Sequence, residues 1–203
     1  MTTNLGFSTS VDFLEKLKNQ TATAHKKLES LPVSASILSP NMEMDDYYHY
    51  LSLMYDVHNS TQKVVFPLLA DLIPDLKERE KTPLIMDDLS YLNYKTGKTT
   101  PVFTKSNISI PFALGILYVV EGSTLGGRFI LKNLETIPGL DQQKGVAYFS
   151  GYGNKTGSYW KNFLNILTSY QEEHHNEGEI IDGAVYAFEC IYNHFLNPVI
   201  NEN

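Results

Sequence analysis

The chain of 203 residues has a single cysteine, no excess of positive charge and no long hydrophobic run. With Cys190 alone, it forms no internal disulfide and no multi-cysteine metal site. Aspartate and glutamate outnumber lysine and arginine by 23 to 16, and the net charge of −7 argues against a dedicated nucleic-acid-binding protein. No apolar run approaches the roughly 20 residues of a membrane-spanning helix. The N-terminal segment has no basic stretch leading into an apolar run, which argues against a secretory signal and favours a cytoplasmic protein.

The sequence also lacks the alternating pattern of β-strands, internal repeats and low-complexity tracts. Apolar residues recur instead at helical spacing, with serine or proline at several expected helix starts. The predicted helices span residues 10–31, 39–60, 84–94, 111–134, 158–170 and 180–196. The charged residues 71–81 are expected to be solvated, and the polar residues 95–107 to form a surface loop. We therefore predict an all-α fold with one domain, residues 1–203.

The helix predicted for residues 111–134, PFALGILYVVEGSTLGGRFILKNL, contains an unusual group of glycines. Gly122, Gly126 and Gly127 lie within six positions, and each costs about 1 kcal/mol relative to alanine in a helix interior. Gly122 and Gly126 are four residues apart and share a face. A face without side chains lets a flat ligand approach the backbone, or lets another helix pack closely. The glycines alone do not distinguish a ligand-binding face from close helix packing.

The first predicted helix carries Lys18, Thr21 and His25. Thr21 belongs to an apolar stripe that is expected to face the core. Lys18 and His25 are seven residues apart, so their side chains lie on nearly the same side of the helix, about 10 Å apart along its axis. Taken alone, a single histidine on a helix is more often structural than a ligand.

Two short patterns match half of a di-iron carboxylate site: Glu172-x-x-His175 and Asp46-x-x-His49. A complete site needs two further carboxylates, of which Glu121 is one candidate and the other is missing. Surface positions in polar turns are therefore the favoured interpretation. The other histidines outside the first helix lie among aromatic residues or in the same acidic turn, and those among aromatics are expected at the edge of the core: His49, His58 and His194.

Three segments, taken together, resemble a bacterial haem oxygenase. They are LKNQTATAHKKLE in the first helix, YVVEGSTLGGRFILKNL in the glycine helix, and FSGYGNKTGSYWKNFL further along. EGSTLGG and GYGxxTGxxW are specific when they occur together in this order, whereas residues 61–109 are not diagnostic. The closest likeness is to the branch associated with bacteriophytochromes.

The resemblance implies the family's single all-helical domain, with haem held between the first helix and the glycine helix. His25 matches the proximal ligand of the haem iron. Gly122, Ser123, Gly126 and Gly127 match the distal helix, on the catalytic side of the haem. The same matching implies further haem contacts from both sides of the site, with the two lysines near the propionates: Lys18, Thr21, Tyr118, Val119, Lys161 and Leu164.

The implied reaction is the O₂-dependent opening of haem to biliverdin, carbon monoxide and ferrous iron, in which haem is both substrate and O₂-activating cofactor. Electrons come from an external donor, which is a ferredoxin, a flavin reductase or ascorbate. A phytochrome that accepts the bilin is a further candidate partner. No nucleic-acid or membrane partner is expected.

Elementary chemistry agrees with these assignments. A neutral imidazole is a standard proximal haem ligand and leaves the opposite position open. A lysine about 10 Å along the helix from that ligand is placed to meet a carboxylate at the porphyrin edge. Animal enzymes of the family carry an aspartate at the position of Ser123, so the residue that delivers protons stays open among Ser123, Thr124, Glu121, Arg128 and bound water.

Two alternatives share the helical scaffold. A non-catalytic haem- or bilin-binding protein would keep His25 and the glycines, and only turnover separates it from the enzyme. A di-iron oxidase is favoured only by the two half-motifs described above. Metal analysis after mixing with haem or Fe(II) distinguishes the di-iron oxidase. One haem per chain supports a haem-binding protein, and two irons per chain support a di-iron oxidase.

Overall fold

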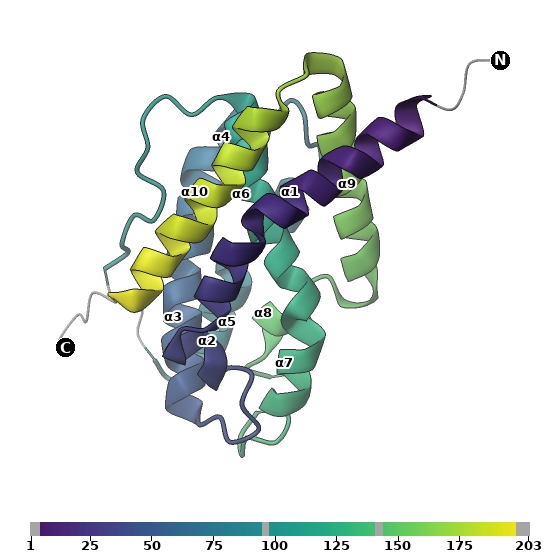
Figure 1. The fold of residues 1–203 in the computed structure, drawn as a ribbon. Coiled ribbons are helices and arrows are strands. Elements are labelled where there is room, and N and C mark those ends of the chain that lie inside the picture. Colours follow the sequence, from purple (N-terminus) through teal and green to yellow (C-terminus); the bar gives the residue numbers. More distant parts are fainter. Residues whose placement is uncertain (1–4, 95–97, 141–143, 198–203) are drawn as a thin grey trace.

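The computed structural model describes residues 5–94, 98–140 and 144–197, with backbone alone for residues 5–10 and Arg128. These residues form helices joined by turns and loops, and no strand occurs among them, which confirms the predicted all-α class (Figure 1). The helices are α1 (Leu5–Glu29), α2 (Pro32–Ser36), α3 (Met44–Ser60), the π-helical η1 (Thr61–Val65), α4 (Phe66–Leu69), the 3₁₀ turn η2 (Lys77–Arg79), α5 (Thr82–Tyr91), α6 (Ile110–Ser123), the 3₁₀ turn η3 (Thr124–Gly126), α7 (Gly127–Leu134), α8 (Ala147–Ser150), the 3₁₀ turn η4 (Gly153–Lys155), α9 (Thr156–His174) and α10 (Glu177–Leu196).

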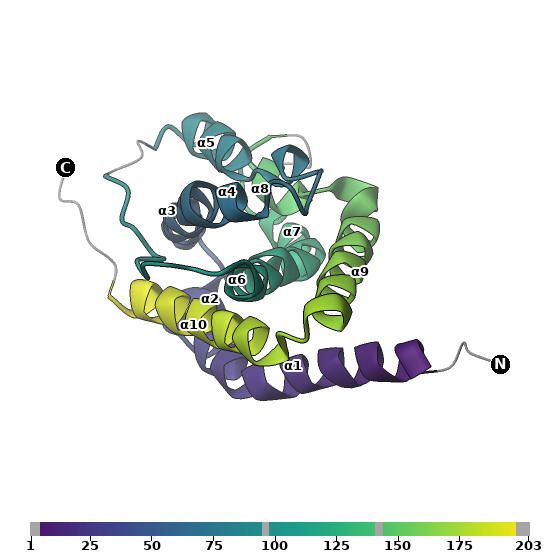
Figure 2. The ribbon, with the colours of Figure 1, turned by 90° about the horizontal axis from the view of Figure 1, so that it is seen from above.

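The apolar helix α6 lies in the middle of the molecule, with α3 and α4 on one side and α10 on another (Figure 2). Its sequence is apolar around nearly the whole circumference, as a helix covered on all sides requires. Helix α10 crosses it at close range: a Cβ on Gly115 would overlap the carbonyl oxygen of Ile180, and one on Gly183 would overlap that of Phe112. Only glycine at these two positions allows the two backbones to approach so closely.

Helix α1 covers α10 and α9 from outside and projects beyond the body of the molecule at its N-terminal end (Figures 1 and 2). Phe13 and Leu17 are buried on its inner side, and Lys16 pairs with Glu177 at the start of α10. The predicted apolar stripe of this helix is therefore confirmed. The helix itself begins at Leu5, earlier than the predicted start near Ser10.

The second long helix begins at Met44 and not at Ser39-Pro40, so that predicted start was wrong. Glu43 and Asp46 form a capping box, in which the Asp46 carboxylate accepts a hydrogen bond from the Glu43 amide at 3.0 Å. This reciprocal pairing satisfies two amides that otherwise have no partner. The Ser39 hydroxyl instead accepts from the amide of Asn41 within a turn.

The helix predicted for residues 111–134 is interrupted. It consists of α6 and α7, joined by the 3₁₀ turn at Thr124–Gly126. The hydroxyl of Ser123 donates to the carbonyl of Val120 and that of Thr124 to the carbonyl of Glu121, each at 2.7 Å. Such bonds back to the preceding turn favour bending, and the nearby glycines resist it little. The other predicted helices are confirmed with shifted ends, and the described part of the 95–107 segment is a loop.

Candidate functional site

His25 lies on the exposed side of α1, near the C-terminal end of the helix. Its side chain is 55% exposed, and its Nε2 lies 3.4 Å from Oε1 of Glu29, one turn further along. On α10, the ring of Phe188 lies 5.4 Å from the imidazole, centroid to centroid. An accessible imidazole that contacts a carboxylate through one nitrogen is placed to bind a metal through the other.

The two other predicted residues of α1 have different surroundings. Thr21 is buried, and its hydroxyl donates to the carbonyl of Leu17 at 2.8 Å, so this residue belongs to the core contact of the helix. Lys18 is exposed, as is Lys161 on α9. Neither lysine forms an ion pair with another residue of the described part of the chain, so both ammonium groups are available to an anionic ligand.

The three glycines of the distal segment differ in what surrounds them. A Cβ at Gly126 would meet no atom within 4 Å, whereas one at Gly122 would contact the Trp160 ring at 3.6 Å. At Gly127, a Cβ would lie 3.0 Å from the carbonyl oxygen of Phe149 on α8. Gly126 therefore faces open space, as a ligand-facing glycine should. Gly127 instead serves close packing against α8, so the two interpretations of the glycines apply to different members.

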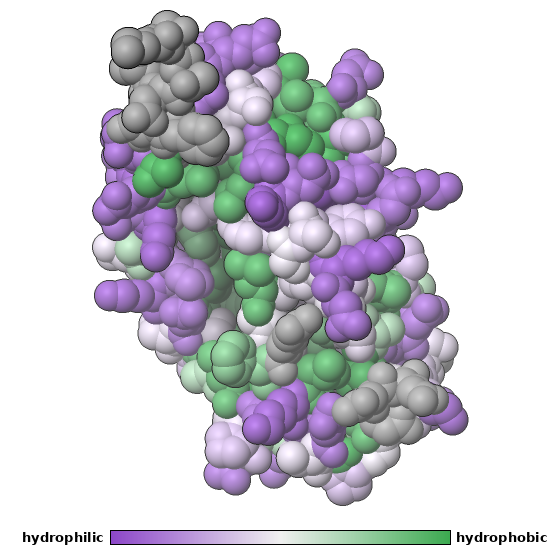
Figure 3. Space-filling model, turned by 90° about the vertical axis from the view of Figure 1, so that its right-hand side faces the viewer, coloured by the Kyte–Doolittle hydropathy of each residue, from purple (hydrophilic) through white to green (hydrophobic). Residues whose placement is uncertain are grey.

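Hydrophobic side chains are exposed beside the open glycine. Leu125 is 44% and Phe129 is 77% exposed, and the two residues lie four positions apart on either side of Gly126. The side of the molecule that carries α7 and α9 contains a recess with hydrophobic atoms in its floor (Figure 3). An apolar recess suits a flat, largely apolar ligand such as haem, and an exposed imidazole suits the metal ion that haem carries.

The remaining predicted haem contacts divide between the core and its edge. Tyr118 is half-buried, its ring lies 5.5 Å from that of Trp160, and burial raises the pKa of its hydroxyl. Leu164 is half-buried at the edge of the core. Val119 is buried within the core. Tyr118 and Leu164 are thus accessible to a ligand in part, whereas the Val119 side chain is occupied by packing.

A buried polar pair that the sequence did not indicate lies near Ser123. The Tyr148 hydroxyl lies 3.1 Å from Nε2 of His58, whereas the Ser123 hydroxyl donates to the carbonyl of Val120. Burial lowers the pKa of His58 to about 3 and raises that of Tyr148, so both are neutral at pH 7. His58 is therefore part of the core, deeper than the predicted edge position. The Arg128 side chain, another predicted proton donor, lies outside the described residues.

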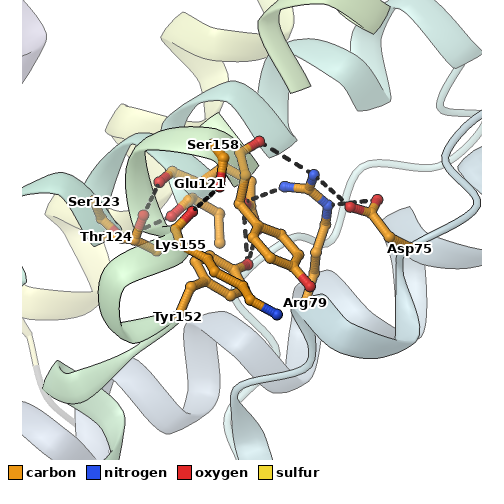
Figure 4. A network of polar contacts seen from close by, with 10 residues as sticks. Asp75, Arg79, Glu121, Ser123, Thr124, Tyr152, Lys155 and Ser158 are labelled. Carbon is orange, nitrogen blue, oxygen red and sulfur yellow. Dashed lines mark hydrogen bonds and ion pairs between the residues drawn. The ribbon is translucent and has the colours of Figure 1, made fainter. Parts of the chain in front are cut away.

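Glu121 is the centre of a second polar group, shown in Figure 4. Its carboxylate accepts hydrogen bonds from Arg79 at 2.6 Å and from the Tyr152 hydroxyl at 3.0 and 3.1 Å. Arg79 and Lys81 are 1% and 2% exposed, so the prediction that residues 71–81 are solvated was wrong for these two. The apolar neighbours Ile73 and Leu76 signalled a buried side of this segment.

The two di-iron half-motifs do not come together. Asp46 caps its own helix, while Glu172 and His175 are exposed at the C-terminal end of α9. Within residues 5–94, 98–140 and 144–197, no group of three or more histidine, cysteine, aspartate or glutamate side chains is placed to hold a metal ion. The geometry gives the di-iron reading no support.

Comparison with known proteins decides the family. The family model of the heme oxygenases matches residues 11–197. The chain belongs to the heme oxygenase family. It is an enzyme of that family, for which haem is the substrate and O₂-activating cofactor, and the predicted family is thereby confirmed.

Individual haem oxygenases agree with this membership. The chain is 26% identical to "Heme oxygenase PigA" of Pseudomonas aeruginosa over 175 residues, which cover 86% of each protein. The fold is shared with the Neisseria meningitidis haem oxygenase studied with bound NO and CO (TM-score 0.69, 23% identity, 94% and 95% of the two chains). It is also shared with the haem oxygenase of Leptospira interrogans (TM-score 0.73, 18% identity, 90% and 98%).

None of the described helices combines the length and apolar composition that crossing a membrane requires. The likeness to the bacteriophytochrome-associated branch is not tested by these relatives and stays a prediction.

Proposed function

We propose that this haem oxygenase binds its substrate between α1 and the α6–η3–α7 segment, with His25 as the iron ligand, and releases biliverdin, carbon monoxide and ferrous iron. The observation that supports this most directly is that both helical segments carry an open position. His25 offers an accessible imidazole, and Gly126 offers backbone with nothing within 4 Å of where a side chain would lie. Bound haem supplies the iron that activates O₂ and is itself the molecule oxidised.

On the proximal side, Glu29 orients the ligand. A carboxylate that accepts a hydrogen bond from one imidazole nitrogen fixes the tautomer and the ring plane, and it makes the other nitrogen a better donor to a metal. The 3.4 Å separation of His25 Nε2 from Glu29 Oε1 is within reach of such a bond after a small rotation. Glu29 is thus a positioning residue for His25.

At the edge of the haem, the exposed Lys18 and Lys161 bind the propionates. At the distal face, the open backbone at Gly126 admits the porphyrin close to the helix, and the half-buried Gly122 lies against the Trp160 ring. Ser123 holds distal water and passes protons, because it is an exposed hydroxyl beside the turn that carries the open backbone of Gly126.

An external donor supplies the electrons: a ferredoxin or flavin reductase in the cell, and ascorbate in the assay. The cytoplasm is the proposed compartment. Iron acquisition and chromophore supply to a bilin-accepting phytochrome are both compatible with this reaction.

Titration with haem, followed by turnover with ascorbate and identification of the products, tests the proposal. We expect one haem per chain with a Soret band, and biliverdin with carbon monoxide on turnover. His25→Ala should remain folded, because an exposed imidazole contributes little to the core, and should lose the parent Soret spectrum and nearly all activity. His174→Ala, which removes an exposed histidine elsewhere, is the matched control.

Two results oppose the proposal. Haem binding without any turnover favours the non-catalytic haem- or bilin-binding protein. An unchanged spectrum and retained activity in His25→Ala would show that another residue is the ligand.

A further inference from the structure

The bend between α6 and α7 is open at Gly126 and in contact with the protein at its neighbours Gly122 and Gly127. At Gly126, a Cβ would meet nothing within 4 Å, so no side chain fixes the backbone from that direction. Glu121, which precedes Gly122, is 3% exposed and points into the protein (Figure 4). The polar contacts of this side chain therefore connect the bend to the rest of the molecule, beside the packing of Gly122 on Trp160 and of Gly127 on α8.

The Glu121 carboxylate connects three separate parts of the chain. Arg79 at the end of η2 donates to Oε2 at 2.6 Å, and Tyr152, just before η4, donates to both oxygens at 3.0 and 3.1 Å. Arg79 is held in turn by two bonds of 2.9 Å to Asp75, and it also donates to the carbonyl of Tyr159 on α9 at 3.3 Å. The last turn of α6 is thereby tied to η2, to the loop before η4 and to α9.

Lys81 completes this group, which we call the Glu121 cluster: Asp75, Arg79, Lys81, Glu121 and Tyr152. The Lys81 ammonium lies 3.3 Å from the centroid of the Tyr152 ring and is attracted by the Glu121 carboxylate. Two cations thus face two carboxylates, and the cluster is neutral as a whole. The Tyr152 ring also stacks on that of Tyr159, with the centroids 4.2 Å apart.

Such a cluster contributes more to holding its side chains in one arrangement than to the stability of the protein. Removing charged groups from water costs about as much as their mutual attraction returns, so apolar residues of similar size often stabilise a protein equally well. Charge-assisted hydrogen bonds are short and directional, however, and they hold a carboxylate in one arrangement. A buried ionic cluster beside the bend between α6 and α7 therefore fixes the geometry of that bend.

We propose that Glu121, Arg79 and Tyr152 are positioning residues, which hold the bend between α6 and α7 and so fix where the Gly126 backbone lies over the substrate. The identity of the substrate rests on the proposed function. The rigidity of the bend does not, because it is a property of the haem-free protein.

The first test removes one hydroxyl. Tyr152→Phe keeps the stacked ring and deletes the hydrogen bond that the hydroxyl shares between the two Glu121 oxygens. Tyr94→Phe is the matched control, because Tyr94 donates to the Asp45 carboxylate at 2.7 Å on an exposed surface. Hydrogen exchange of the haem-free proteins should become about five- to tenfold faster at the amides of residues 122–127 in Tyr152→Phe alone, as the loss of a hydrogen bond implies. On turnover, the mixture of biliverdin isomers should broaden in Tyr152→Phe and match the parent in Tyr94→Phe.

The second test separates position from folding. Glu121→Gln retains an acceptor oxygen and should remain closer to the parent in both measurements than Glu121→Ala. Where single variants fail to fold, Arg79→Met with Glu121→Leu replaces both charges by apolar groups, and it should fold but show fast exchange and a broadened isomer mixture. Parent-like exchange in Tyr152→Phe and in the folded double variant overturns the proposal, and so does fast exchange with an unchanged isomer mixture and kcat. Failure of the parent protein itself to make biliverdin contradicts the proposed function instead, and leaves the exchange measurement to decide on the bend.

Discussion

The Arg79 guanidinium lies 2.6 Å from the Glu121 carboxylate, and both side chains are buried beneath the distal helix. Burial raises the pKa of the Glu121 carboxyl, while the cation at this distance, the Tyr152 hydroxyl and Lys81 oppose that rise. We take the carboxyl as ionised, because it accepts bonds from a guanidinium and a hydroxyl at once. The free energy of unfolding should therefore depend on whether one partner of this pair is removed or both.

Glu121→Ala should lower the free energy of unfolding by about 3–5 kcal/mol, because it leaves the buried Arg79 without its closest counter-charge. The double variant Arg79→Met with Glu121→Leu should lose less, since the guanidinium is removed together with its closest counter-charge and, among the charged groups, only Lys81 and Asp75 lose a partner. Urea denaturation of the haem-free proteins measures both. Equal losses in the two variants would mean that packing, and not charge pairing, accounts for the effect.

The stability of the protein should fall in acid because of His58. This side chain is 3% exposed, and burial lowers its pKa from 6.5 to about 3. The unfolded chain therefore binds a proton at His58 below pH 6.5 that the folded chain refuses, and stability decreases as the pH drops from about 6.5 to about 3. At one pKa unit per 1.36 kcal/mol, the contribution of His58 to this loss is at most about 5 kcal/mol.

His58→Gln should flatten the decrease, because the amide can still bond Tyr148 but takes up no proton. His174→Gln, which removes an exposed histidine, is the control and should retain the slope of the parent. Denaturation midpoints at several pH values between 3 and 7 provide the comparison. An identical slope in His58→Gln and the parent would assign the acid sensitivity to other groups.

The helical fold could be predicted, and the residues of the two proposed sides of the site could be named, because their signals are local. Lys18 and His25 lie on one helix, and the glycines of the distal helix lie within six positions. Helical periodicity and two short motifs suffice for such features. The same local rules placed a helix start at Ser39-Pro40, where the protein uses the capping box of Glu43 and Asp46 instead.

Features that depend on distant contacts could not be predicted. Arg79 and Tyr152 are 42 and 31 positions from Glu121, and no sequence pattern links a carboxylate to one particular arginine or tyrosine. Glycines present the same difficulty. Gly115 is in tight contact with α10 and Gly126 faces open space, yet the two look alike in a sequence because neither has a side chain to indicate its surroundings.

Substitutions at these two glycines should have opposite effects. In Gly126→Leu the new side chain enters open space and helix propensity improves by up to about 1 kcal/mol, so the haem-free protein should stay folded. The side chain would occupy the proposed position of the substrate, and haem affinity or O₂ access should be lost. In Gly115→Ala the methyl group meets backbone atoms of α10, and a destabilisation of about 1–3 kcal/mol or more is expected.

Thermal denaturation and haem titration of the two variants separate the effects. A Gly126→Leu protein that cannot be recovered in folded form would show that Gly126, too, serves packing. A Gly115→Ala protein as stable as the parent would contradict the close approach of α6 and α10.

The exposed lysines should influence which edge of the haem is opened. Lys18 and Lys161 lie on α1 and α9, and contacts of exposed ammonium groups with propionates contribute no more than about 1 kcal/mol each. Energies of this size hardly change the affinity for haem. They do change the ratio of two seatings of a nearly symmetric plate, since 1.4 kcal/mol is a tenfold ratio. Lys18→Ala with Lys161→Ala should therefore alter the mixture of biliverdin isomers more than the affinity.

Chromatographic separation of the products, beside haem titration, tests this expectation. Lys26→Ala with Lys63→Ala is the matched control, because it removes the same charge from exposed positions outside the predicted site. A change of isomers in both double variants would indicate an effect of net charge alone. If Lys18→Ala with Lys161→Ala gives the parent mixture, the propionates are seated by other residues, and the half-buried Tyr118 is the next side chain to replace.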